Sequence, residues 1–358
     1  MAECKLPREM VVEIFLRLPP KSLMRFKCIH KSWNSLINSR HVVDKHFHFH
    51  NNQTSSTTIL LRRCVTHRET RNEDVVHSLL TLRNETNGIV GHCGGIICLT
   101  LYHPSDLFLY NPAIREFKVI PEPCLPGLRE LLYRSEAFGY DPNSEDFFIV
   151  VVAGYGQYND GGIEERLTLY PQRAEMYTMR TDSWEEINIH NLENETTMFR
   201  PYNFQVHLKA IVWFDTSDRV FHTALTPDPL YRYPAHDFAL AVWNNSVAVF
   251  GYHREGSQPF EIWVTGDFDG FTCAWIKHLS IDIMESPLSL VLWEGNRSLL
   301  VSPRVRAALY SFATKTSQYF PIYASDYFNA IPVVNSIVPL NRDLICADIL
   351  IWVSEKAS

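Results

Sequence analysis

The sequence predicts a small all-α domain at the N-terminus, followed by a large all-β domain. Apolar residues recur at helical spacing within the first 47 residues. Beyond them the chain is a series of short apolar runs separated by Gly, Pro, Asn and Asp, which is typical of strands. The length of 358 residues also suits two domains, since domains usually contain ~100–200 residues. We expect the helical domain at 1–47, a polar linker at 48–58 and the β domain at 59–358.

Three helices are expected in the N-terminal domain. The first begins near Pro7, where a first helical turn favours proline, and ends at Pro19-Pro20, because the ring removes a backbone donor. Ser39 can cap one further turn after the third helix. The apolar positions of these segments are Val11, Ile14, Phe15 and Leu18, then Leu23 and Phe26, then Trp33, Leu36 and Ile37, and finally Val42, Val43 and Phe47.

Other apolar residues of this domain fall outside those faces, and two explanations are open. They could pack on the domain that follows, or they could form a helical docking surface for another protein. These residues are Leu6, Met10, Val12, Leu16 and Cys28.

Charge is distributed unevenly along the chain, whose net charge is −7. Residues 1–47 hold nine basic and four acidic residues, a net +5, and the remainder holds 24 basic and 36 acidic residues, a net −12. This asymmetry fits two solvated surfaces of different composition. It equally fits two partners, an acidic one for the N-terminal domain and a basic one for the β domain.

The segment from Leu6 to about Phe47, LPREMVVEIFLRLPPKSLMRFKCIHKSWNSLI and its continuation, resembles an F-box. The match includes the opening Leu-Pro, the second Leu-Pro, Leu-x-x-Phe and Lys-Ser-Trp. The resemblance implies a substrate-recognition subunit of a ubiquitin ligase that binds a Skp-type adaptor, and through it a cullin and a RING subunit. The adaptor-contact or core residues that it implies are Leu6, Pro7, Ile14, Leu18, Pro19, Leu23, Phe26, Cys28 and Trp33.

The β domain contains hairpins that recur like repeats. Aromatic residues after the turns are separated by 47, 44 and 44 residues at Trp184, Tyr231, Trp275 and Tyr319. Propeller blades repeat at ~40–50 residues, so we expect a kelch-like or irregular β-propeller of about six blades. Three hairpins carry aromatic pairs at equal spacing: Tyr110 and Phe117, Tyr177 and Trp184, and Phe312 and Tyr319.

This domain resembles a plant F-box-associated domain through segments such as GHCGGIICL, LYNPAIREFKVIP and FEIWVTGDFDGFTCAWIKHL. With PPKSLMRFKCI, RAEMYTMRTDSW and VNSIVPLN, the combination is similar to the S-locus F-box proteins of pollen. That resemblance implies a pollen determinant of self-incompatibility, which binds basic, non-self S-RNases for ubiquitination. A receptor for another plant protein, a scaffold, and a glycan-binding or enzymatic propeller stay open. Substrate contacts are expected on the loops 154–171, 190–202 and 226–237.

No motif indicates catalysis, and we expect no enzyme activity, no cofactor and no metal. HFHFH, residues 46–50, would place three imidazoles on one face of a strand, but no Cys or carboxylate at ligand spacing supports a zinc site. Gly91-x-x-Gly94-Gly95 lacks the Lys-Ser/Thr of a phosphate loop and fits a tight turn between strands.

The chain is expected in the cytoplasm or nucleus, without a nucleic-acid or membrane partner. Its eight cysteines form no C-x-x-C pair, and the N-terminal residues lack an apolar signal core. No apolar run reaches the ~18 residues needed to span a bilayer. We therefore expect a protein that is not secreted and keeps its thiols reduced.

Overall fold

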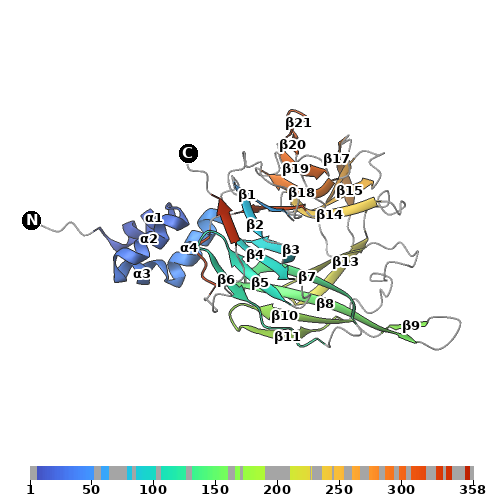
Figure 1. Ribbon diagram of the computed structural model, residues 1–358, viewed down its shortest axis with the longest axis horizontal. Coiled ribbons are helices and arrows are strands. Elements are labelled where there is room, and N and C mark those ends of the chain that lie inside the picture. Colours follow the sequence, from blue (N-terminus) through green and yellow to red (C-terminus); the bar gives the residue numbers. More distant parts are fainter. Residues whose placement is uncertain are drawn as a thin grey trace, which may run out of the picture. The chain divides into compact units, whose positions relative to one another are not determined.

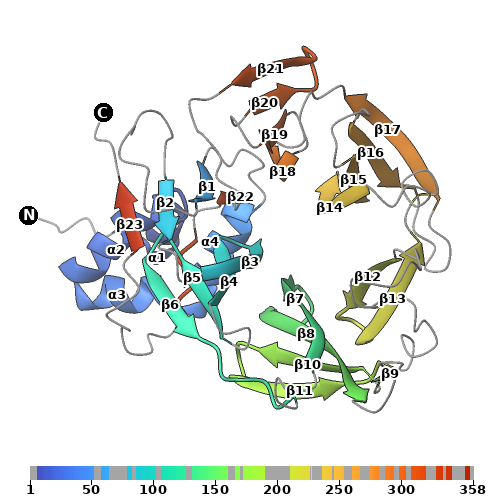
Figure 2. The ribbon, with the colours of Figure 1, turned by 45° about the vertical axis from the view of Figure 1, so that its right-hand side comes forward.

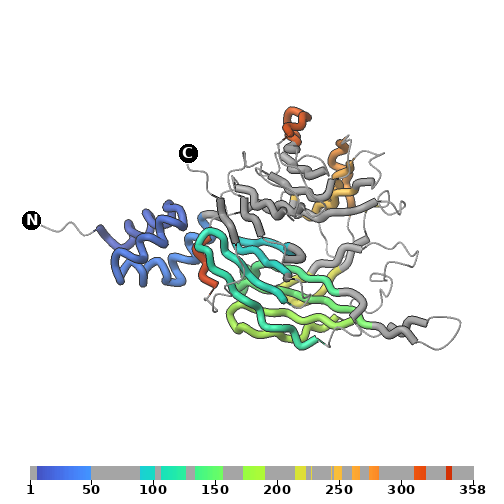
Figure 3. The backbone as a smooth tube through the Cα atoms, viewed as in Figure 1, coloured from blue at the N-terminus to red at the C-terminus, as the bar shows by residue number. Residues whose placement is uncertain are grey.

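The chain divides into two compact units in the computed structural model, Met1–Pro121 with Asn329–Ser358 as unit 1 and Glu122–Phe328 as unit 2. Figure 3 traces the backbone from the blue helices to the red segment near the C-terminus. The residues that the structure describes are 6–51, 58–63, 79–82, 86–101, 106–125, 131–159, 166–169, 172–189, 210–225, 227, 236–243, 246–253, 260–266, 274–281, 287–293, 298–303, 308–319, 328–333, 336–340 and 351–354.

Four helices, not three, form the N-terminal domain, which we call the head (Figure 1). They are α1 (Arg8–Leu16), α2 (Pro20–Ile29), α3 (Lys31–Ile37) and α4 (Arg40–Asn51). Pro7 is the N-cap of α1, and Pro20 is the first residue of α2, where its missing N–H costs nothing. The Ser39 carbonyl accepts the amides of Val42 and Val43, and the single turn expected there continues as a full helix. Among the described residues, no helix is long and apolar enough to cross a membrane.

The buried face of α1 differs from the expected one. Val12, Phe15 and Leu16 are buried, whereas Ile14 is 45% exposed. The first helix is rich enough in apolar residues to offer more than one face at helical spacing. It packs against α4, and its Phe15 packs against Phe26 and Trp33, so packing within the head decides which face is buried.

Helix α4 also corrects the interpretation of HFHFH. These residues are helical rather than extended, so the three imidazoles do not share one face. His46 is fully buried and its Nε2 lies 3.5 Å from the Leu18 carbonyl oxygen, whereas His48 is exposed. Residues 48–51, which we placed in the linker, are the end of this helix.

The β domain, which we call the body, consists of several sheets. In the four- and five-stranded sheets the strands are antiparallel and neighbours follow chain order apart from β9, as β14 to β17 do in Figure 2, whereas two of the smaller pairs join strands far apart in the sequence. Three sheets have four strands, a fourth has five, and three further pairs complete the described strands. One sheet contains β3 (Thr86–Cys93), β4 (Ile96–Leu101), β5 (Leu107–Asn111) and β6 (Glu116–Val119), and the five-stranded sheet contains β7 (Leu131–Asp141), β8 (Asp146–Asn159), β10 (Arg173–Thr178) and β11 (Ser183–Ile187), with β9 (Arg166–Leu169) paired to β8. The third sheet contains β14 (His236–Trp243), β15 (Ser246–His253), β16 (Phe260–Thr265) and β17 (Trp275–Ile281). The fourth contains β18 (Pro287–Trp293), β19 (Ser298–Pro303), β20 (Ala308–Ser311) and β21 (Thr316–Tyr319). The pairs are β12 (Ala210–Asp215) with β13 (Val220–Leu225), β1 (Thr58–Arg63) with β22 (Phe328–Val333), and β2 (Leu79–Leu82) with β23 (Ile351–Ser354).

One turn geometry recurs in five hairpins of the body. The last turn residue has a left-handed φ of 51° to 59° in each of them, at Arg115, Glu145, Asp182, Arg219 and Lys315. A polar residue stands four positions earlier, namely Asn111, Asp141, Thr178, Asp215 and Ser311. The side-chain oxygens of four of them, all except Thr178, accept a turn amide two or three residues on, as in an Asx- or ST-turn. The hairpins therefore share a structural unit that the aromatic spacing only suggested.

The expected aromatic pairs are correct in two hairpins and wrong in the third. Tyr110 lies opposite Phe117 and Tyr177 lies opposite Trp184, with ring centroids 6.5 Å and 5.5 Å apart. In the hairpin of β20 and β21 the equivalent residue is Tyr310, because Phe312 lies in the turn. Tyr231, which we used for the period, lies outside the described residues.

Consecutive sheets of unit 2 pack through apolar and aromatic side chains. The core beside β8 and β10 includes Val150 and Met176, together with Phe221 of β13, and the Phe148 and Phe214 rings are 6.4 Å apart. The core beside β15 and β16 similarly includes Tyr310 of β20. This packing of one sheet on the next buries the inward faces that the alternating strands predict.

In unit 1 a segment near the C-terminus is held on the sheet of β3 to β6. The Asn111 side chain is fully buried, and its Nδ2 donates to the carbonyls of Ser336 and Val338 at 3.2 and 3.0 Å. The Leu340 amide donates to Glu116 at 3.1 Å. Residues more than 220 positions apart in the sequence thus share one hydrogen-bond network.

Candidate functional site

Exposed apolar side chains are concentrated in the head. Leu6, Met10 and Ile14 are 54%, 53% and 45% exposed. Met10 and Ile14 lie one turn apart on the same face of α1, and Leu6 stands two residues before the helix begins, so we call these three residues the stripe. Ile29, at the end of α2, is 64% exposed. Four of the seven large hydrophobic side chains that are exposed among the described residues therefore lie between positions 6 and 29.

An aromatic cluster between α1, α2 and α3 holds together these helices, the first of which carries most of the stripe. Phe15 of α1, Phe26 of α2 and Trp33 of α3 pack with centroid distances of 5.4 to 6.1 Å. Leu23 and Ile37 are fully buried in the same domain. Two of these contacts are edge-to-face, and such ring contacts stabilise the packing of the three helices beyond the burial of the rings.

The structure divides the nine residues implied by the F-box resemblance into two groups. Five of them are exposed and available to a partner: Leu6, Pro7, Ile14, Pro19 and Cys28. The other four support the head from inside, with Leu23 buried and Leu18, Phe26 and Trp33 half-buried.

The apolar residues outside the expected faces also separate. Leu6, Met10 and Cys28 are exposed, which fits a docking surface, whereas Val12 and Leu16 are buried. Ile29 was missed by the sequence analysis, because it lies outside every helical stripe and only its exposure singles it out.

Buried charges occupy one face of the sheet β7-β8-β10-β11. Arg134 and Glu136 form an ion pair of 2.8 Å between Nε and Oε1, and Glu175 is 2% exposed with Oε2 accepting the Cys124 amide at 2.8 Å. Burial raises the pKa of both Glu136 and Glu175. The buried Tyr155 hydroxyl has no hydrogen-bond partner in the described part of the chain. This cluster contains no nucleophile–base pair, and sequence spacing did not reveal it because its members come from three strands.

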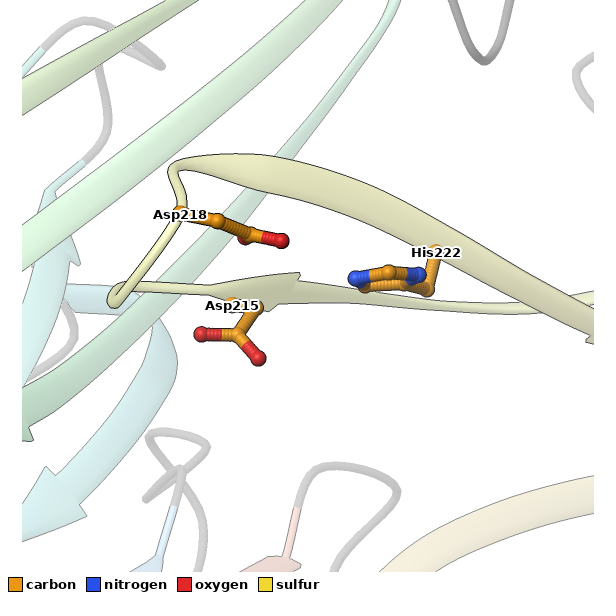
Figure 4. Close-up of side chains that lie close together, drawn as sticks. All are labelled: Asp215, Asp218 and His222. Atoms are coloured by element: carbon orange, nitrogen blue, oxygen red, sulfur yellow. The ribbon is translucent and has the colours of Figure 1, made fainter. Parts of the chain in front are cut away.

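A second polar cluster lies on the hairpin of β12 and β13 (Figure 4). Ligand atoms of Asp215, Asp218 and His222 lie within 4.8 Å of one another, so the three groups could hold a divalent cation. Both carboxylates also accept turn amides, from Ser217 at 2.8 Å and from Val220 at 3.1 Å. Turn formation therefore accounts for the positions of both aspartates.

The loops expected to contact a substrate fall largely outside the described residues. This applies to all of 190–202 and to most of 226–237. In the 154–171 segment, Gly156 to Asn159 of β8 pair with β9, so part of that insertion extends the sheet as a hairpin.

Comparison with known proteins identifies both parts of the chain. A family model described as the F-box domain matches residues 4–45, and one described as the F-box associated beta propeller domain matches residues 47–346. An F-box/kelch-repeat protein of Arabidopsis thaliana is 32% identical over 162 residues, covering 41% of this chain and 44% of that protein. An F-box protein of the same plant is 24% identical over 315 residues, covering 74% of this chain and 72% of that protein.

A solved structure of a functionally unknown protein from Desulfotomaculum acetoxidans matches with a TM-score of 0.34 and 10% identity. The match covers 69% of this chain and 88% of that one, but at this score it supports no conclusion. The match to the first of these relatives spans less than half of its length, so activity and partners have to be argued from this chain's own residues.

Proposed function

This chain belongs to the family of F-box proteins with an F-box-associated β-propeller domain, and we propose that it is the substrate-recognition subunit of an SCF-type ubiquitin ligase complex. The head binds a Skp-type adaptor, which connects it to a cullin and a RING subunit, and the body holds a protein substrate. The RING subunit brings the charged conjugating enzyme, so this chain contributes proximity and not chemistry. It acts in the cytoplasm or nucleus as a non-catalytic receptor.

The exposed stripe of Leu6, Met10 and Ile14 carries this proposal. An apolar stripe along an exposed helix is the form in which helices dock into a partner's groove, and burying each side chain stabilises a complex by ~1.5–3 kcal/mol. The head's net charge of +5 favours an acidic adaptor through long-range attraction.

Co-purification with a Skp-type adaptor and cullin tests the stripe. We expect Met10→Asp combined with Ile14→Asp to weaken adaptor binding at least ~100-fold, since two apolar anchors are replaced by charges. Both positions are exposed, so the head keeps its core. The matched control is Ser35→Asp, a change at an exposed position of α3 that leaves the stripe intact. Adaptor binding that survives the double change contradicts the proposed role of the head.

We further propose that the substrate is a basic S-RNase, and that the protein is a pollen determinant that marks non-self S-RNases for degradation. The similarity of PPKSLMRFKCI, RAEMYTMRTDSW and VNSIVPLN to S-locus F-box proteins supports this narrower role, and so does the body's net charge of −12. Opposite charges accelerate encounter between a receptor and its substrate.

A pull-down against a panel of S-RNases, with the complete chain bound to its adaptor, tests the narrower role. We expect binding to several members and none to a self form. A result in which no S-RNase binds while the adaptor still does removes the pollen role and leaves the ligase role standing.

A further inference from the structure

The last helix of the head touches the turn between β3 and β4 of the body, where an aromatic ring meets a glycine. Phe47 of α4 is 5% exposed, and Gly94 lies in the turn between β3 and β4. A Cβ added at Gly94 would overlap the Phe47 ring at Cε2 and would lie 2.9 Å from Cζ and 3.0 Å from Cδ2. Real Cβ atoms essentially never approach another atom so closely, so the ring rests directly on the glycine backbone.

Glycine is required at position 94 for two separate reasons. Its φ is +56°, a conformation that residues other than glycine disfavour, and its Cα faces the ring. The two effects can be separated by experiment, because removal of the ring relieves the overlap but leaves the backbone strain unchanged.

Helix α4 is anchored in the head as well as seated on the body. Val42 is fully buried and Val43 is 9% exposed within the head, and α4 packs against α1 and α3. The helix continues without a break from Arg40 to Asn51, so Phe47 belongs to a rigid element and not to a flexible linker. Figure 1 shows this helix beside the sheet of β3 to β6.

The sheet on which Phe47 rests is itself held firmly. Leu99 of β4 and Leu109 of β5 are buried, and the Asn111 bonds fix residues 336–340 on the same sheet. The turn that contains Gly94 thus belongs to a well-packed part of unit 1 and can support the helix.

We propose that the Phe47–Gly94 contact is a joint that sets the orientation of the adaptor-binding head relative to the first sheet of the body. Phe47 and Gly94 are then positioning residues. They touch neither substrate nor adaptor, and they determine where the body presents a bound substrate to the conjugating enzyme. This role in transfer depends on the proposed function, whereas the joint itself does not.

A distance measurement tests the joint directly. Spin labels attached through non-natural amino acids at Glu9 of α1 and Val119 of β6, both exposed, report the separation of head and sheet. We expect one narrow distance distribution in the native chain. Phe47→Ala should broaden it, and Gly94→Ala should shift or broaden it.

A double-mutant cycle shows whether the two residues act on each other. We expect Gly94→Ala to lower the thermal midpoint on the order of 5 °C in the native background and clearly less when Phe47 is already Ala. Gly266→Ala is the matched control, since an added Cβ there meets its nearest atom, a backbone oxygen, at 3.5 Å. It should leave the distance distribution unchanged.

Reconstituted ubiquitin transfer to lysines of the chain itself separates positioning from folding. At saturating adaptor, we expect Phe47→Ala to keep native adaptor affinity but to lower the transfer rate several-fold or redistribute the modified lysines, with partial rescue by Phe47→Leu. Distance distributions that stay unchanged in both Phe47→Ala and Gly94→Ala would overturn the proposal that this contact orients the head, whether or not the adaptor still binds. Altered distances with native transfer would overturn the positioning role. Failure of the native chain to bind the adaptor would instead count against the proposed function.

Discussion

Asn111 shows how a single polar side chain can hold together distant parts of the chain. It is fully buried, and its Oδ1 caps its own turn by accepting the Ala113 amide at 3.1 Å. Its Nδ2 satisfies two carbonyls of the segment near the C-terminus. Loss of this amide would leave buried carbonyls unpaired, which costs more than the hydrogen bonds themselves contribute.

We expect Asn111→Asp to destabilise unit 1 by about 2–4 kcal/mol, because the carboxylate keeps the turn cap but cannot donate to either carbonyl. Asn111→Ala should cost a similar amount. Denaturant unfolding, followed by a probe in the first sheet, measures both. Asn143→Ala, a change in an exposed turn, is the control and should cost less than ~1 kcal/mol. A native-like Asp variant would show that the two carbonyl bonds do not matter.

Glu175 makes stability depend on pH. Burial raises its pKa in the folded chain, so the folded state binds this proton more tightly than the unfolded state does. Its contribution to stability is therefore present below pH ~4.5 and is lost as pH rises through the raised pKa.

We expect Glu175→Gln to reduce the stability that unit 2 gains on acidification from pH 7 towards ~4.5. The Gln side-chain oxygen can still accept the Cys124 amide, so the variant removes the ionisation and keeps the hydrogen bond. Unfolding of variant and native chains across this pH range gives the difference. Parallel pH curves for the two proteins would exclude Glu175 as the titrating group.

At the scale of elements, the recurring turn explains why the hairpins of the body resemble one another. Each turn places a residue other than glycine in the left-handed region, at a cost of ~1–2 kcal/mol, and most compensate with a side-chain cap at its first position. The hairpin of β20 and β21 isolates the backbone effect, because Lys315 is exposed.

We expect Lys315→Gly to stabilise unit 2 by about 0.5 kcal/mol, because relief of strain slightly exceeds the entropy that glycine loses on folding. Lys315→Val should destabilise it by about 1–2 kcal/mol, since a branched side chain tolerates this conformation poorly. Thermal unfolding of the two variants provides the test, with Ala313→Ser as a control at an exposed position of the same turn. Equal midpoints for the Gly and Val variants would contradict the strain.

The elements also show how far sequence reasoning reaches. Hairpins such as β10 with β11 were predictable, because polar turn residues and flanking strand formers lie within a few positions of one another. The course of α4 was not, since HFHFH alternates like a strand and only its continuation from Ser39 makes it helical. The free face of α1 was ambiguous for a similar reason, because several stripes have helical spacing.

At the scale of the whole molecule, the head and the body differ in the sign of their net charge. The head carries +5 and the remainder −12. Under the proposed function, the body would attract a basic substrate and the head would repel it. Such attraction acts mainly on the rate of association and is screened by salt.

We expect the association rate of a basic S-RNase to fall at least ~10-fold between about 50 and 500 mM salt, with a much smaller change in the dissociation rate. Surface-based kinetics at several salt concentrations measures both rates. A neutral or acidic ribonuclease of the same fold is the control. An association rate that does not change with salt concentration would argue against electrostatic attraction by the body.

The sequence by itself determined which segments form helices and strands in most cases, where the turns lie, and the families to which the head and the body are similar. These features depend on residues a few positions apart, where spacing and backbone preference act directly. Only the tertiary structure decided which face of α1 stays exposed, that Phe47 rests on Gly94, and that Asn111 binds a segment more than 220 residues away. Those contacts depend on how the elements pack, and local periodicity does not specify which distant residue a side chain will contact.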